Sequence, residues 1–230
     1  MTEKSTQSVV ITIDGPAGVG KSTAARGLAR RLGAAFLDTG AMYRAVTLAA
    51  VERGIDPSDT AAVESLMETR RFEFCPQGDL TRVWIDGADK TAAIREPHLT
   101  EQVRHIAAAA PLRARLVQMQ RAFAADARRV VTEGRDQGTV VFPDAAVKIF
   151  LTADPTERAR RRHSELRAAG KDVSLDAVLT GQQQRDAADE SRTVGPLKPA
   201  QDAAIVDTTH LTAEQVIDQL ESLVRERIHG

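Results

Sequence analysis

The residues with the clearest chemical meaning form the string Gly15-Pro-Ala-Gly-Val-Gly20-Lys21-Ser22. It fills every fixed position of the pattern G-x-x-x-x-G-K-[S/T], in which glycines let backbone N–H groups converge on phosphate oxygens. Lys21 is expected to reach the β- and γ-phosphates of ATP, and the Ser22 hydroxyl to hold Mg²⁺. The predicted ATP-binding residues are Gly15, Pro16, Ala17, Gly18, Val19, Gly20, Lys21, Ser22 and Thr23.

The elements around this string fit a phosphate-binding loop. A buried strand is predicted over Val9–Ile13 and a helix over Lys21–Leu32, and a helix N-terminus adds favourable partial charge for an anion. The alternative is a glycine-rich strand–helix turn without a ligand. It is disfavoured because the motif is complete and stands in the context that it requires.

The rest of the chain alternates short apolar strands with helices. Strands are predicted over Ala35–Leu37, Val130–Thr132, Val147–Leu151 and Ala204–Val206. Helices are predicted over Gly40–Gly54, Asp59–Arg70, His98 to about Ala127 with a break near Pro111, Pro155–Ala169, Ser174–Ala188 and Thr212–Ile228. Together with Val9–Ile13, this order predicts an α/β fold whose five-stranded parallel sheet is flanked by helices on both faces.

One segment departs from this order. Phe72–Cys75 and Arg82–Ile85 alternate around the turn-rich Pro76–Asp79, which predicts a β-hairpin and an insertion over about 61–95. Cys75 is expected to be a buried strand residue. The whole chain, 1–230, is expected to be a single domain.

Composition excludes several functional classes. With 31 basic and 32 acidic residues the net charge is −1, so no strongly basic surface for nucleic acid is expected. The single cysteine excludes a disulfide framework and a cysteine-built zinc site, which makes the cytoplasm the expected location. No membrane span or membrane partner is expected. Only six of the basic residues are lysines; the arginine excess suits a phosphorylated ligand, and genomic base composition explains it equally well.

A phosphate loop alone is compatible with kinases, switch GTPases and motor ATPases. The sequence contains no asparagine, so it lacks the N-K-x-D motif that reads guanine. The chain is also short for a motor and shows no second nucleotide-binding repeat. A kinase of a small substrate is therefore favoured.

Four further strings indicate the acceptor. They are Asp38-Thr-Gly-Ala-Met-Tyr-Arg44, Glu133-Gly-Arg-Asp136 leading into Gly138-Thr-Val-Val-Phe-Pro143, Arg158-Ala-Arg-Arg-Arg162 and Asp189-Glu-Ser-Arg192. From about Val9 to Ile228 the chain closely resembles the bacterial cytidylate kinases. The first two strings carry most of this resemblance, because they are far more specific than the phosphate loop.

The resemblance implies ATP-dependent phosphorylation of CMP and dCMP to CDP and dCDP by a P-loop kinase, with a monomer as the expected state. It implies a lid over about 155–192, and catalytic roles for Lys21, Arg135, Arg158 and Arg162, the last two as lid arginines over ATP. Thr39 and Arg44 would hold the CMP phosphate with Tyr43 packing nearby, and Arg113 would contact phosphate and base. The remaining roles fall to Arg135 for the monophosphate, Asp136 for the cytosine amino group, and Asp189 and Arg192 for the pentose.

Each role has a plain alternative. Arg44, Arg113 and the Arg158–Arg162 cluster could be solvated charges, Asp136 a turn former, Tyr43 a core residue, and Asp189 with Arg192 an i, i+3 pair. Arg104 stands where the family usually has a small hydroxyl residue, which puts the details of base recognition in doubt. The role of Glu133 is left open. Two rival functions are a small kinase for UMP, AMP or a metabolite, and an ATP-binding module that transfers no phosphate.

Overall fold

The computed structural model describes residues 8–78 and 80–229. The chain divides into two compact units, one formed by residues 33–130 and the other by residues 9–32 and 131–229. The expected boundaries of the insertion, of the lid and of a single domain remain predictions. Five strands form the main sheet in the order β2-β6-β1-β7-β8, and a separate three-stranded sheet has the order β3-β4-β5. The predicted α/β fold is confirmed.

The unit formed by residues 9–32 and 131–229 includes the phosphate loop and contains most of the main sheet. Strand β1 (Val9–Asp14) pairs in parallel with β7 (Val147–Thr152), which pairs in parallel with β8 (Ala204–Asp207). Strand β6 spans Arg129–Gly134 and leads into a short π-helical turn over Gln137–Val141. β-branched residues fill these strands, as expected for strands covered on both faces. The fully buried side chains of this unit include Ile11, Ile13, Leu28, Val131, Leu151 and Leu220.

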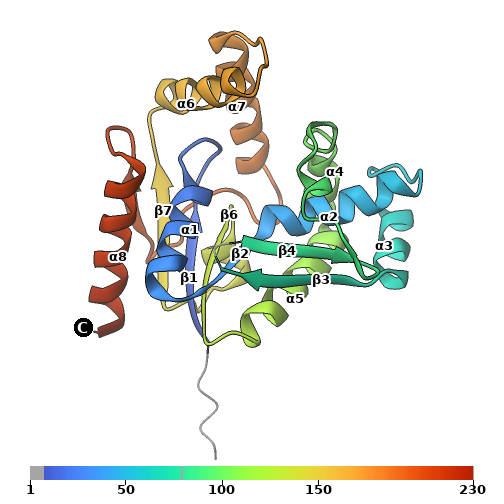
Figure 1. The fold of residues 1–230 in the computed structure, drawn as a ribbon, viewed down its shortest axis with the longest axis horizontal. Helices are drawn as coiled ribbons and strands as arrows, with labels where there is room; N and C mark the ends of the chain where they lie inside the picture. The colour runs from blue at the N-terminus through green and yellow to red at the C-terminus, as the bar shows by residue number, and fades with distance from the viewer. Residues whose placement is uncertain (1–7, 79, 230) are drawn as a thin grey trace, which may run out of the picture. The chain divides into compact units, whose positions relative to one another are not determined.

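Four helices surround these strands: α1 (Lys21–Leu32), α6 (Pro155–Ala168), α7 (Leu175–Glu190) and α8 (Ala213–His229). Helix α8 runs alongside α1 (Figure 1). A Cβ on Gly27 would lie 2.3 Å from Ile217 Cδ1, so the glycine lets the two helices approach closely. Helices α6 and α7 pack against each other beyond the end of β7 (Figure 1).

The other unit begins with β2 (Ala35–Asp38) and α2 (Thr39–Glu52), followed by α3 (Thr60–Thr69). After the small sheet come 3₁₀ turns at Ala93–Arg95 and Pro97–Leu99, then α4 (Val103–Ala108) and α5 (Ala110–Ala125). Ala109 is extended and Pro111 lies in the first turn of α5, which confirms the predicted break near Pro111. The core of this unit includes Leu37, Met42, Ile94, Leu99, Ile106, Leu112 and Leu116.

The predicted hairpin is present as β3 (Phe72–Gln77) and β4 (Leu80–Ile85), extended by β5 (Ala88–Asp89); Asp79 of its turn lies outside the described residues. The prediction that Cys75 is buried is wrong, because the side chain is exposed. Cys75 is opposite Arg82 in the ladder, whereas Phe74 is opposite the fully buried Val83. Residues directly opposite share a face, so the register puts Cys75 on the polar face.

Candidate active site

The phosphate loop connects the end of β1 to the start of α1. Gly15, Gly18 and Gly20 all have positive φ, at 147°, 80° and 89°. A Cβ on Gly15 would lie 2.3 Å from the carbonyl oxygen of Leu151, and one on Gly18 would lie 2.6 Å from Gln182 Nε2. Larger residues at these two positions would strain the backbone and collide with strand β7 and helix α7. The glycine pattern read from the sequence is therefore a steric requirement of this loop.

Lys21 is buried at the end of the loop, and its Nζ donates to the carbonyl oxygen of Pro16 at 2.6 Å. Burial, followed by the charges of Arg135 and Arg185, holds the pKa of Lys21 well below its ordinary value, while Glu133 and Asp14 act in the opposite direction. Two arginines therefore oppose the positive charge of Lys21. A polyanion such as a triphosphate would relieve this repulsion.

Ser22 and Glu133 form the part of the site that fits Mg²⁺. The Ser22 hydroxyl donates to Glu133 Oε1 at 2.5 Å, and Glu133 is buried at the end of β6. Hydroxyl and carboxylate oxygens are ligands that Mg²⁺ prefers, and at phosphate sites it keeps waters and uses few protein groups. Within residues 8–78 and 80–229 no cluster of three or more His, Cys, Asp or Glu could hold a metal.

Asp14 is the last residue of β1, directly before the phosphate loop. Its carboxylate is buried and accepts the backbone N–H groups of Gln137 at 2.9 Å and Gly138 at 2.8 Å. Burial raises the pKa of Asp14 to about 6, against the lowering effect of the two hydrogen bonds, and the charge of Asp136 raises it further. Asp14 thus fixes the turn that follows Asp136, the residue expected to read the cytosine amino group.

The structure brings together three of the residues expected to contact the acceptor. Arg135 Nε donates to Asp189 Oδ2 at 2.7 Å and Arg135 Nη1 donates to Gly134 O at 3.2 Å. Asp189 is buried and also pairs with Arg192, which lies beyond the end of α7. The Asp189–Arg192 contact is therefore more than an i, i+3 pair within a helix, because Asp189 links Arg135 to it. Asp136 is buried as well.

The two arginines expected in a lid lie in different environments. Arg158 is buried, pairs with Asp186, and donates from Nη1 to the carbonyl oxygen of Ala17 at 2.9 Å. Arg162 is exposed and donates to Glu165 at 2.9 Å. Only Arg158 contacts the phosphate loop in this structure. Arg162 has the solvated position that was the alternative for this cluster.

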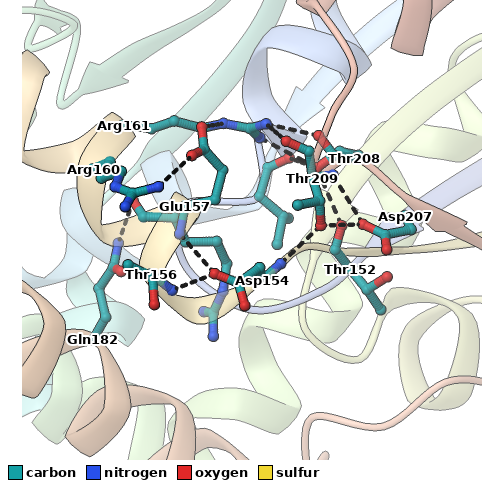
Figure 2. Close-up of polar contacts among 12 residues, drawn as sticks. Thr152, Asp154, Thr156, Glu157, Arg160, Arg161, Gln182, Asp207, Thr208 and Thr209 are labelled. Atoms are coloured by element: carbon teal, nitrogen blue, oxygen red, sulfur yellow. Dashed lines mark hydrogen bonds and ion pairs between the residues drawn. The ribbon is translucent and has the colours of Figure 1, made fainter.

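Figure 2 shows how the start of α6 is fixed next to the loop after β8. The Asp154 side chain caps α6 by accepting the N–H groups of Thr156 and Glu157, at 2.9 and 3.0 Å. Arg161 pairs with Glu157 and donates to the carbonyl oxygens of Thr208 and Thr209. The Thr208 hydroxyl also lies 3.1 Å from Val19 O in the phosphate loop. The base of α6 is thus tied to the loop.

The unit formed by residues 33–130 places the remaining acceptor candidates on α2 and α5. Thr39 is buried, and Tyr43 and Arg44 are half-buried on α2. Arg113 is only 4% exposed; its Nη1 donates to the Tyr43 hydroxyl at 3.2 Å, and its guanidinium carbon lies 6.0 Å from the centre of the Tyr43 ring. Arg113 is therefore not a solvated helix charge. Arg104 is exposed, on α4.

Asp38, Arg95 and Thr81 hold the start of α2. Asp38 caps the helix by accepting the N–H of Ala41 at 2.9 Å, and Arg95 donates to its other oxygen at 3.2 Å. The buried Thr81 hydroxyl accepts the N–H of Asp38 at 3.0 Å and donates to Phe36 O at 2.7 Å. Thr81 belongs to the predicted insertion, so the hairpin positions the residue directly before Thr39.

Sequence reasoning missed Thr81, Arg95, Arg185 and Asp186 as site residues. Arg185 has a recognisable signal, because it precedes Asp189 and Arg192 by four and seven residues, the spacing of one helix face. Asp186 has a weaker one, the i, i+3 spacing to Asp189. Thr81 and Arg95 have none, since their partners are distant along the chain.

The family model described as Cytidylate kinase matches residues 11–226. The chain belongs to the cytidylate kinase family. It is 48% identical over 221 residues to the cytidylate kinase of Mycolicibacterium paratuberculosis, covering 95% of this chain and 96% of that one. It is 48% identical over 216 residues to that of Corynebacterium glutamicum, covering 94% of both.

Two further similarities are to part of a larger protein and to a solved structure of low sequence identity. A bifunctional pantoate ligase/cytidylate kinase of Synechococcus is 44% identical over 220 residues, which are 94% of this chain and 40% of that one. A crystal structure of an uncharacterized protein from Eubacterium ventriosum aligns with a TM-score of 0.52 at 12% identity, covering 95% of this chain and 98% of that one. The second likeness supports the fold alone.

Proposed function

We propose that the chain transfers the γ-phosphoryl group of ATP to CMP and dCMP, giving ADP with CDP or dCDP. Two observations support this function. The family match spans nearly the whole chain, and the phosphate loop carries a buried lysine surrounded by further cations. In the transfer, a phosphate oxygen of CMP forms the new bond to the γ-phosphorus as the bond to the β-phosphate oxygen breaks.

On the donor side, the N–H groups of the loop and the Lys21 ammonium would hold the β- and γ-phosphates. Ser22 would hold Mg²⁺, with Glu133 orienting that hydroxyl or a metal-bound water. When bound, Mg²⁺ neutralises charge on the phosphates and helps to align them. Arg158, and Arg162 after rearrangement, would add positive charge to the transferring group.

On the acceptor side, we assign the CMP phosphate to Arg44, Arg113, Arg135 and Thr39, with Tyr43 supporting Arg113. No protein nucleophile or strong base is required, because the phosphate oxygen of CMP is already anionic near neutral pH. The arginines instead offset the repulsion between two polyanions. Among the described residues the Arg44 side chain has no hydrogen-bond or ion-pair partner, so its guanidinium has no such contact to give up on binding a phosphate.

Base and sugar recognition fall to three further side chains. Asp136 would accept from the cytosine amino group, and UMP would place a carbonyl oxygen against the same carboxylate, a repulsion that favours CMP. Asp189 and Arg192 would contact the pentose. The exposed Arg104 stands in place of the usual hydroxyl residue, so discrimination against UMP is assigned mainly to Asp136.

Two rival functions are tested by one experiment. Purified protein is given ATP and Mg²⁺ with CMP, dCMP, UMP and AMP in separate reactions, and ADP release is measured. We expect CMP and dCMP to be the preferred acceptors. Preference for UMP or AMP would support another small kinase, and nucleotide binding without ADP release on any acceptor would support a non-catalytic module. We further propose that the protein acts as a monomer in the cytoplasm, without a nucleic-acid partner. Among the helices of residues 8–78 and 80–229, none combines the length and the apolar content that a membrane span requires.

A further inference from the structure

A buried ion pair binds both backbone polar groups of one residue of the phosphate loop. The N–H of Ala17 donates to Asp186 Oδ1 at 3.1 Å, and the carbonyl oxygen of Ala17 accepts from Arg158 Nη1 at 2.9 Å. Arg158 and Asp186 also pair directly, and each is only 7% exposed. One carboxylate of α7 and one guanidinium of α6 therefore fix the peptide groups on either side of Ala17.

The next loop residue is in close contact with the same helices. A Cβ on Gly18 would lie 2.6 Å from Gln182 Nε2 and 3.3 Å from Arg158 Cβ. Gln182 Nε2 in turn donates to Arg158 O at 3.4 Å. A shift of α6 and α7 would therefore have to move the tip of the loop or break these contacts.

The junction is poorly explained as a device for stability alone. A buried ion pair adds little net stability, since desolvation of both charges offsets their attraction. Here Arg158 Nε and Gln182 Oε1 are also buried without a hydrogen-bond partner among the described residues, which is a further cost. Positioning of the loop accounts for the arrangement better.

Helix α7 carries a second buried carboxylate on the same face. Asp189 follows Asp186 by three residues and is bonded to Arg135 and Arg192. One rigid helix thus holds the donor loop through Asp186 and an acceptor-side arginine through Asp189. A displacement of α7 by either ligand is transmitted to the groups that hold the other.

We propose that Asp186 is a positioning residue that sets the conformation of the phosphate loop through Ala17 and Arg158, and that α7 couples the binding of ATP to that of CMP. The coupling part rests on the proposed function, because it assumes that Arg135 contacts the acceptor. Coupling of this kind is a ratio of dissociation constants and is reciprocal.

The test compares Asp186→Asn with Asp202→Asn. Asp202 pairs with Lys148 in the same unit, and Lys148 is only 8% exposed. Asp202→Asn is therefore a matched control, because it also removes the charge partner of a buried cation but does not touch Ala17. Calorimetry measures the dissociation constant of a non-hydrolysable ATP analogue alone, and that of CMP with and without the analogue. Thermal melting reports stability.

We expect Asp186→Asn to weaken analogue binding about 10- to 100-fold, because one charge-assisted hydrogen bond is lost. We also expect the ratio of the CMP dissociation constants measured without and with the analogue, here called the CMP ratio, to move toward one. Asp202→Asn should lower the melting temperature and leave both quantities within twofold of wild type. Analogue binding and a CMP ratio unchanged in Asp186→Asn would overturn the proposal. If Asp186→Asn fails to fold, Asp186→Glu, which keeps the charge but shifts the carboxylate by one methylene from the Ala17 N–H, takes the same test with the same expected losses.

The outcome is separable from that of the proposed function. Analogue binding needs no acceptor, so its loss in Asp186→Asn would support the positioning role even if wild-type protein phosphorylated a different monophosphate. A kinetic readout adds to this, since a positioning role predicts a larger rise in the KM for ATP than in that for CMP in Asp186→Asn. An equal rise for both would count against it.

Discussion

The buried carboxylate of Asp14 makes a specific contribution to the pH dependence of stability. Its pKa rises from 3.8 to about 6 on folding, mainly through burial. The folded state therefore binds a proton more tightly than the unfolded chain. Between these two pKa values the folded state holds more protons, so this group lowers the free energy of unfolding as the pH rises.

The size of the effect follows from the same shift. The full pKa shift corresponds to about 3 kcal/mol of stabilisation at low pH, at 1.36 kcal/mol per pKa unit. Part of this stabilisation has already been lost at pH 4.5. Between pH 4.5 and pH 7 the free energy of unfolding falls by a further amount of about 2 kcal/mol. No discount for solvent screening is needed, because the side chain is almost fully buried.

Asp14→Asn removes the titration and keeps the shape. Asparagine loses one of the two hydrogen bonds from Gln137 and Gly138, and the amide does not titrate over the window. The wild-type charge beside Lys21 develops only as Asp14 loses its proton, and its effect is already contained in the pKa of about 6. The free energy of unfolding of wild type and variant, from urea titrations at about half-unit steps from pH 4.5 to pH 7, is subtracted at each pH. We expect the variant to gain about 2 kcal/mol relative to wild type as the pH rises. A difference that stays flat would refute the argument.

Three other substitutions test the site. Lys21→Ala should lower kcat by about 100-fold or more while the far-ultraviolet dichroism stays native, and near-normal turnover would contradict the phosphate-loop assignment. Asp136→Ala should reduce the CMP-over-UMP ratio of kcat/KM by about 10-fold or more with little change in the KM for ATP; equal proportional losses for CMP and UMP would remove Asp136 from base recognition. Thr81→Val should lower the free energy of unfolding in urea by about 1–3 kcal/mol, because two buried backbone groups lose a partner. It should also raise the KM for CMP more than that for ATP. Thr81→Ser should restore stability and KM, and a stability loss without the KM change would limit Thr81 to a structural role.

Much of the fold was predictable because its signals are local. The phosphate loop needs glycine at positions whose backbone no other residue adopts easily, as Gly18 and Gly20 show. The strands are short β-branched runs. The break before α5 follows from Pro111, which has no N–H to donate to the carbonyl of Ala107 and so cannot continue α4. Strings such as Asp38–Arg44 further indicated the family, which the comparisons then showed.

Which face of the small sheet is buried could not be predicted in the same way. Alternation assigns residues to two faces, and only the pairing register with packing on one side decides which face is buried. Cys75 is apolar enough to be assigned to the core from its type, yet its ladder partner Arg82 lies on the solvent face with it.

The amino-acid sequence by itself determined the phosphate loop, the alternation of strands and helices, and the residue types that recognise a nucleotide, since each depends on neighbours along the chain. The tertiary structure alone decided that Asp186 and Arg158 bind Ala17, that Thr81 holds the residue before Thr39, and that Asp14 is buried deeply enough to raise its pKa. These properties depend on burial and on contacts between residues far apart in sequence, and a local pattern carries no information about either.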